Sequence, residues 1–257
     1  MTNAVAQTVI RRDRLIVLIG LAAVILAATL YTVNMAGQLN QPMDVAMMPA
    51  DHSAMPGVHG FWMLFAMWTI MQVAMMSPTA VPMMLMHGKI ERHRQPHGFP
   101  FFRTALFFSG YLILWALFSL AFALLQMGLQ SAELLSPMMA TKSPWLTGGI
   151  LIAAGLFQFS HLKQACLKQC RSPVTYLMTE WRNGRGGALF MGLKHGLHCV
   201  GCCWIIMALL FVAGVMNLFW MAAITAFVLI EKLAVRGEQF GKIVGVGLII
   251  WGIVIIV

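Results

Sequence analysis

Seven apolar segments of roughly membrane-spanning length, separated by short connectors, constrain this chain more than any other feature. An α-helix needs about 20 apolar residues to cross a bilayer. The segments lie at 15–35, 59–86, 104–128, 145–165, 187–213, 218–232 and 240–257. With 60% hydrophobic and 10% charged residues, the 257-residue chain is too apolar for a soluble domain. The sequence therefore predicts an all-α, polytopic transmembrane helix bundle of about seven spans, forming a single membrane domain over residues 1–257.

The basic residues are distributed unevenly between the connectors. Those at 36–58, 129–144 and 214–217 contain a single Lys or Arg, Lys142, although the chain has 17 in all. Cytoplasmic connectors are enriched in Lys and Arg, so we expect the N-terminus inside and the C-terminus outside. Segment 15–35 is interpreted as an anchor and not as a cleaved signal. The pattern predicts a multi-pass protein whose partner is the lipid bilayer, and it accounts for the net charge of +9 without nucleic acid.

The fifth apolar segment contains an unusual concentration of cysteine and histidine. Cys199, Cys202 and Cys203 follow His195 and His198 within ten residues. In an α-helix, residues three or four apart share a face, so one helix would present several sulfur and nitrogen donors together. Such donors bind Cu(I), Zn(II) or iron rather than Mg²⁺ or Ca²⁺. The pattern predicts a metal or redox site, with ordinary packing of small buried thiols as the alternative.

A second pair of cysteines lies in the connector at 162–186, which is expected to be cytoplasmic. Cys166 and Cys170 are one helical turn apart and have basic neighbours. Nearby positive charge favours the thiolate form that binds metals, and cytosolic thiols usually stay reduced. Together with the cysteines of the fifth segment, these two residues would offer up to five thiolates.

Methionine is the third candidate donor, with 22 residues in the chain. Many of these lie in the second apolar segment at helical spacing, and the candidate ligands are Met71, Met75, Met76 and Met83. Thioether sulfur is a soft, uncharged ligand suited to Cu(I), although Met is also a common filler of helix packing. Pro78 and Pro82 are expected to break or kink this helix. The preceding loop at 36–58 is rich in Met and His and would face outward, where it could collect copper.

These donors favour one function and leave two alternatives. The leading hypothesis is a membrane protein that binds a soft metal for transport, transfer or metal-centre assembly, and the thioethers favour Cu(I) as that metal. Zn(II) is the second metal. The alternatives are a thiol or haem membrane redox protein and a non-catalytic assembly or scaffold subunit of a membrane complex. The expected protein partner is a metallochaperone or a membrane complex. No phosphate-binding loop, nucleophile elbow or other catalytic motif is found, so no catalytic residue is assigned.

Several short motifs between about Trp62 and Lys232 carry a family resemblance. They are Ala74-Met75-Met76-x-Pro78-x-x-x-Pro82-Met83, Leu162-Lys163-x-x-Cys166-Leu167-x-x-Cys170-Arg171-Ser172-Pro173, Gly196-x-x-Cys199-x-Gly201-Cys202-Cys203-Trp204, Gly214-Val215-Met216-Asn217-x-x-Trp220-Met221 and Glu231-Lys232. The chain resembles a bacterial family of metal-binding integral membrane proteins classified as a domain of unknown function. The resemblance implies a bacterial inner-membrane location. Ser160-His161 departs from the family pattern and makes His161 an additional candidate ligand.

Overall fold

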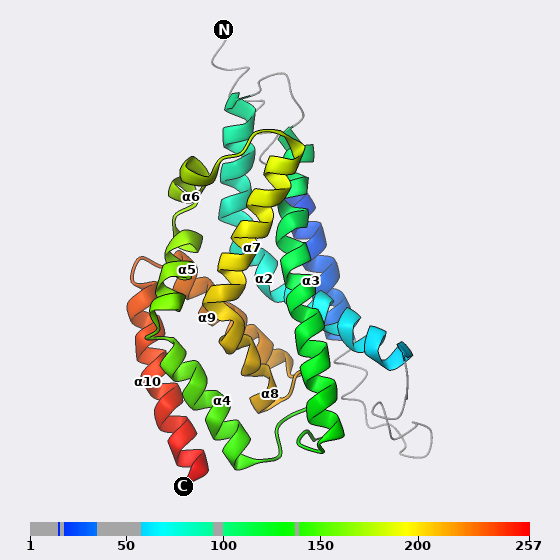
Figure 1. Ribbon diagram of the computed structural model, residues 1–257, viewed down its shortest axis with the longest axis vertical. Coiled ribbons are helices and arrows are strands. Elements are labelled where there is room, and N and C mark those ends of the chain that lie inside the picture. Colours follow the sequence, from blue (N-terminus) through cyan, green and yellow to red (C-terminus); the bar gives the residue numbers. More distant parts are fainter. Residues whose placement is uncertain (1–14, 16–17, 35–57, 95–99, 137–138) are drawn as a thin grey trace.

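The computed structural model describes residue 15 and residues 18–34, 58–94, 100–136 and 139–257, and within these residues every element is a helix (Figure 1). A helix at Leu18–Asn34 comes first. It is followed by α2 (Val58–Arg94), α3 (Pro100–Ser131), α4 (Pro144–Phe157), α5 (His161–Arg171), α6 (Pro173–Glu180), α7 (Gly184–Ala208), α8 (Leu210–Ala213), α9 (Leu218–Leu233) and α10 (Gly237–Ile256). The all-α class predicted from the apolar segments is therefore confirmed.

Among the described residues, four helices are long and apolar enough to cross a membrane. They cover Gly60–Arg94, Phe101–Ser131, Gly184–Ala213 and Gly237–Ile256. The expected segment at 145–165 is not one straight helix, because α4 ends at Phe157 and α5 turns away by 63°. The side chain of Ser160 accepts a hydrogen bond from the backbone N–H of Lys163 and so caps a new helix at this point. The remaining apolar segments form the shorter helices Leu18–Asn34 and α9.

Helix α2 continues through both of its prolines. It extends from Val58 to Arg94 with Pro78 and Pro82 inside it, and its ribbon changes direction along its length in Figure 1. A proline removes one backbone hydrogen bond and crowds the preceding turn, which bends a helix without necessarily ending it. The two prolines thus leave a single bent helix.

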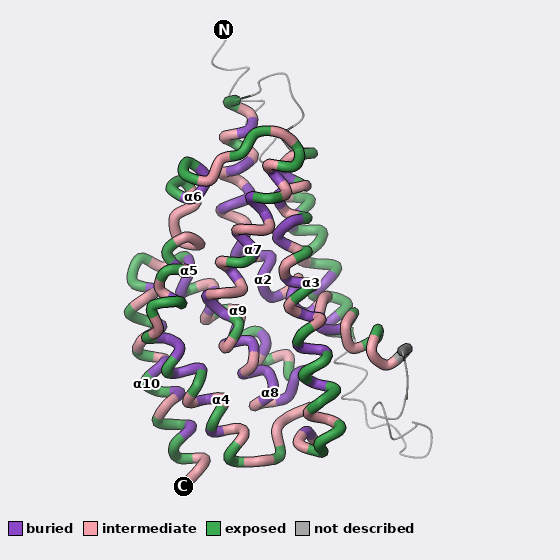
Figure 2. Tube along the Cα trace, viewed as in Figure 1, coloured by how far each residue is buried: buried purple, intermediate pink, exposed green. Residues whose placement is uncertain are grey.

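The buried residues concentrate where α2, α3 and α7 meet (Figure 2). Helices α3 and α7 pack in parallel, and Gly192 of α7 lies directly against the backbone of Phe107 in α3. Small residues allow helix backbones to approach this closely. On the other side of the molecule, Gly155 of α4 lies against the carbonyl oxygen of Gly245 in α10. Glycine therefore allows close backbone contact both between α3 and α7 and between α4 and α10.

Replacing Gly192 with Ala should destabilise the protein by about 1–3 kcal/mol, the usual cost of overpacking a core. The added Cβ would meet the carbonyl oxygen of Phe107, a backbone atom that cannot rotate away. The matched control is Gly128→Ala in α3, where a Cβ meets nothing within 4 Å. Thermal denaturation in detergent micelles should show a lower midpoint for Gly192→Ala alone. Equal midpoints for both variants would contradict the close α3–α7 contact.

Candidate metal centre

Helix α7 brings four of the predicted donors onto its buried face. His195, Cys199, Cys202 and Cys203 are each at most 3% exposed. Their spacing of four, three and one residues keeps them on one side of the helix, which faces the core formed with α2 and α3. Expecting these residues to share a face was therefore correct.

A fourth thiol joins the cysteines of α7 from another helix. Cys170 of α5 contacts the thiols of Cys199 and Cys202, and Cys203 contacts the same two thiols. The thiols of Cys202 and Cys203 also donate to the carbonyl oxygen of Cys199, at 3.1 and 2.8 Å. All four cysteines are free thiols. We call Cys170, Cys199, Cys202 and Cys203 the thiol cluster.

A buried lysine from α9 lies beside this cluster. The Nζ atom of Lys232 is 2.9 Å from Sγ of Cys199 and 3.1 Å from Oγ1 of Thr79. Lys232 is 5% exposed, so its ammonium group is buried beside the cluster. The sequence indicated a functional role for Lys232 only by its position at the end of an apolar segment, because charged residues in membrane segments often have a function.

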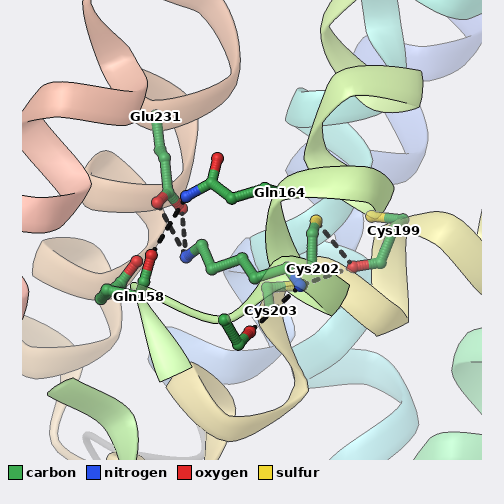
Figure 3. Close-up of polar contacts among 8 residues, drawn as sticks. Gln158, Gln164, Cys199, Cys202, Cys203 and Glu231 are labelled. Carbon is green, nitrogen blue, oxygen red and sulfur yellow. Dashed lines mark hydrogen bonds and ion pairs between the residues drawn. The ribbon is translucent and has the colours of Figure 1, made fainter. Parts of the chain in front are cut away.

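A second set of polar residues lies next to the thiol cluster. Lys163 and Glu231 form an ion pair at 2.7 Å with side chains 0% and 3% exposed. Gln164 donates to the backbone oxygen of Gln158, whose own side-chain amide is buried without a hydrogen-bond partner. Figure 3 shows Glu231, Gln158 and Gln164 on one side and the α7 cysteines on the other. Glu231 directly precedes Lys232 in the sequence, but its carboxylate forms an ion pair with Lys163.

Tyr111 of α3 connects the cluster to α2. Its hydroxyl donates to the carbonyl oxygen of Met76 at 3.0 Å and lies 3.4 Å from Sγ of Cys199. The four candidate thioether ligands share the hydrophobic core with the cysteines and are each at most 3% exposed; they are Met71, Met75, Met76 and Met83. These four methionines, which we call the methionine stripe, are thus buried, and the carbonyl oxygen of Met76 is linked to Cys199 through the hydroxyl of Tyr111.

Three other candidate ligands lie outside the thiol cluster. Cys166 is half-buried and packs against Gly201. His198 is half-buried, and its Nδ1 atom is 2.7 Å from the carbonyl oxygen of Lys194. His161 is exposed at the start of α5. Apart from Val58, the Met/His-rich loop at 36–58 lies outside the described residues.

The ring of His195 is held by aromatic neighbours. It lies 5.9 Å from the ring of Phe107, 5.7 Å from that of Tyr111 and 5.6 Å from that of Tyr176. Burial, followed by the nearby carboxylate of Glu180, raises the pKa of Tyr176, so its hydroxyl stays neutral and donates to the carbonyl oxygen of Met191 at 2.7 Å. His195 Nδ1 is buried without a hydrogen-bond partner. Sequence reasoning did not identify His87, whose Nε2 is buried and unpartnered in the same way.

The donor set suits a soft metal. Thiolates bind Cu(I), and four cysteines are also a ligand set of structural Zn(II) sites. Among the described residues, no three His, Cys, Asp or Glu side chains are already arranged to hold one ion. Binding would therefore require small rotations of the thiols, which now contact one another. Two helices, α5 and α7, supply the sulfur atoms.

Comparison with known proteins identifies a copper-related family. No curated protein and no solved structure matches the chain. A family model described as "Copper chaperone" (PpoB2) matches residues 65–255, a stretch that contains the thiol cluster, Lys232 and the candidate methionines. This agrees with the soft donors found in the sequence and gives copper precedence over the other metals considered. The chain thus belongs to this family of copper chaperones.

Proposed function

We propose that this protein is an integral membrane protein that binds Cu(I) at the thiol cluster and passes it on, in transport, in transfer to a partner or in assembly of a copper centre. The observation that carries the proposal is the meeting of Cys170 from α5 with Cys199 and Cys202 from α7. These thiols are brought together only by the tertiary fold. Copper is the cargo of this function, and its ligands are the thiolates.

The charge of Lys232 supports a monovalent metal. Cu(I) held by two thiolates carries a net charge of −1, which the ammonium group 2.9 Å from Cys199 Sγ would neutralise. A buried charge without a partner is costly in a medium of low dielectric constant. Zn(II) on the same two thiolates would leave the group with a positive charge, and Glu231 is already paired with Lys163. The fixed charges thus favour Cu(I) over Zn(II).

Lipid contact is supported by the outer surface of the bundle. Large apolar side chains are exposed on α4, α9 and α10, for example Trp145 (71%), Phe219 (81%) and Ile243 (70%). The 20 residues of α10 extend about 30 Å, the thickness of the hydrocarbon core. We propose seven membrane segments in a bacterial inner membrane, with the N-terminus inside and the C-terminus outside. Gly241, in the second turn of α10, lies against Glu231, so Glu231 would lie near the cytoplasmic end of α10, whereas Cys199 lies near the middle of the Gly184–Ala213 span.

Reporter fusions test this orientation. A fusion after Arg94, in the basic connector between α2 and α3, should report the cytoplasm, and one after Glu133, between α3 and α4, should report the periplasm. The expectation follows from the asymmetry of Lys and Arg between the connectors. The measurement is the activity of an alkaline phosphatase and of a fluorescent protein at each position. Reversed signals would overturn the orientation and would place the connector between α2 and α3 outside the cytoplasm.

The methionine stripe gives a separate test of copper passage. Leu conserves volume and apolarity, so the triple variant Met71→Leu, Met75→Leu and Met76→Leu should lose less than about 1.5 kcal/mol of stability per site. It removes three thioethers from the buried face of α2. We expect normal folding with reduced Cu(I) uptake into vesicles and unchanged Zn(II) binding. Unchanged copper uptake in the folded variant would assign the stripe to packing alone.

Elemental analysis of the purified protein, made without a histidine tag and loaded with Cu(I), tests the proposal as a whole. Stoichiometric copper with a featureless visible spectrum is expected, because Cu(I) thiolates do not absorb there. A Soret band would favour the haem alternative, in which His195 and His198 were the candidate ligands. Stoichiometric co-purification of membrane partners with a protein that takes up no copper would favour the scaffold alternative.

A further inference from the structure

A continuous stack of rings extends from the thiol cluster along α3 toward the end of α2. His195 lies between the rings of Tyr111 and Phe107, at 5.7 and 5.9 Å. Phe107 is in turn 4.8 Å from His87, and His87 is 5.4 Å from Trp181. The interplanar angles of these contacts are 25–32°. At one end Tyr111 lies 3.4 Å from Sγ of Cys199. We call these five rings the ring stack.

Both histidines of the ring stack have a buried ring nitrogen with no hydrogen-bond partner. These atoms are Nε2 of His87 and Nδ1 of His195, and the two residues are 0% and 3% exposed. An unpartnered buried polar atom costs about 1–3 kcal/mol, so packing alone gives no reason for two in one stack. Imidazole nitrogen is a ligand for copper. Nδ1 of His87 lies 3.2 Å from Thr104 Oγ1, and donation to that oxygen leaves the Nε2 lone pair free.

The far end of the ring stack reaches charged and more exposed side chains. Trp181 is half-buried, and the guanidinium of Arg94 lies 4.8 Å above its ring. Glu91, one helical turn beyond His87, is paired with Arg103. This end lies at the connector between α2 and α3 and just before α7, both of which the proposed topology places in the cytoplasm.

We propose that His195 and His87 form a relay that moves Cu(I) between the thiol cluster and the cytoplasmic end of the bundle, with His87 as a copper-binding residue in its own right. The inference rests on the proposed function. In the first step a bond from copper to a thiolate sulfur is exchanged for one to a nitrogen of His195. In the second step the bond to His195 breaks, copper crosses the face of Phe107, and a bond to Nε2 of His87 forms; copper remains Cu(I) throughout and no electron is transferred. The thiolate that is released stays beside the Lys232 ammonium. Phe107 separates the two imidazoles and offers its π face to the passing cation.

The relay predicts a defect in rate without a defect in affinity. The full-length protein in detergent is loaded with one equivalent of Cu(I) and mixed with a water-soluble bicinchoninate or bathocuproine chelator in a stopped-flow instrument. His87→Phe keeps a stacking ring but removes both nitrogens, so copper transfer should slow at least about tenfold while stoichiometry and affinity stay as in the wild type. His93→Phe is the matched control, because His93 is an exposed histidine on the same helix and its loss should leave the rate unchanged.

A second variant keeps the test decisive if His87→Phe does not fold. Thr104→Val removes the hydroxyl that orients His87 and should slow transfer by a smaller factor. If His87→Phe loads normally and transfers copper within twofold of the wild-type rate, the relay is overturned and the copper site is unaffected. If His87→Phe is unfolded, the same result in Thr104→Val has the same meaning. A wild-type protein that takes up no Cu(I) would instead overturn the proposed function, and the relay with it.

Discussion

Replacing Cys199 with Ser should reduce Cu(I) affinity at least about 100-fold, since even removal of a residue behind a metal ligand commonly costs 10- to 100-fold. Cys199 contacts Cys170, Cys202 and Cys203 and also lies 2.9 Å from the Lys232 ammonium, so its loss removes a ligand and the thiolate next to the buried cation. Serine is nearly isosteric and its hydroxyl is a hard, weak ligand for Cu(I). The measurement is a competition titration against a Cu(I)-selective chelator.

The other cysteines provide graded comparisons for this result. Cys170→Ser should also weaken binding strongly although it lies on a different helix, because its thiol contacts both Cys199 and Cys202. Cys166→Ser is the control, since Cys166 packs against Gly201 outside the cluster. Equal loss of copper in Cys166→Ser and Cys170→Ser would contradict the assignment of Cys170, and not Cys166, to the thiol cluster. Full copper retention in the triple Cys199/Cys202/Cys203 serine variant would remove this metal site.

Replacing Lys163 with Met should destabilise the protein by about 3–5 kcal/mol, the cost of leaving a buried charge without its partner. The Nζ atom of Lys163 lies 2.7 Å from the carboxylate of Glu231, and both side chains are almost fully buried. The double variant Lys163→Met/Glu231→Leu should recover most of the loss, because a buried ion pair can often be replaced by apolar side chains at little cost. Thermal unfolding in detergent, followed by circular dichroism, measures each variant.

An exposed ion pair of the same types is the control for Lys163. Lys242 and Glu238 also lie 2.7 Å apart, but their side chains are 43% and 46% exposed. Exposed pairs one helical turn apart contribute about 0.3–0.5 kcal/mol, so Lys242→Met should hardly change the unfolding midpoint. Similar midpoints for Lys163→Met and Lys242→Met would contradict the importance of the buried pair.

The position of most helices was predictable from the sequence. Apolar runs bounded by polar, glycine or proline residues mark α2, α3, α7, α9 and α10. A membrane-spanning helix is surrounded by protein or by lipid, so it must be apolar along most of its length. The break between α4 and α5 was missed, because Ser160 lies inside an apolar run and only its capping hydrogen bond reveals that a new helix begins there. Apolar content alone does not distinguish one helix from two.

Within the candidate site, the sequence by itself determined the shared face of His195, Cys199, Cys202 and Cys203, because the 3.6-residue period of one helix fixes how its own side chains are directed. Only the tertiary structure decided that Cys170, and not Cys166, joins them. It likewise decided that Lys232 turns inward to Cys199 and that His87 stacks on the path to His195. These contacts join residues that are 20 to 88 positions apart, and they depend on how closely neighbouring helices approach α7, which no local pattern of residues encodes.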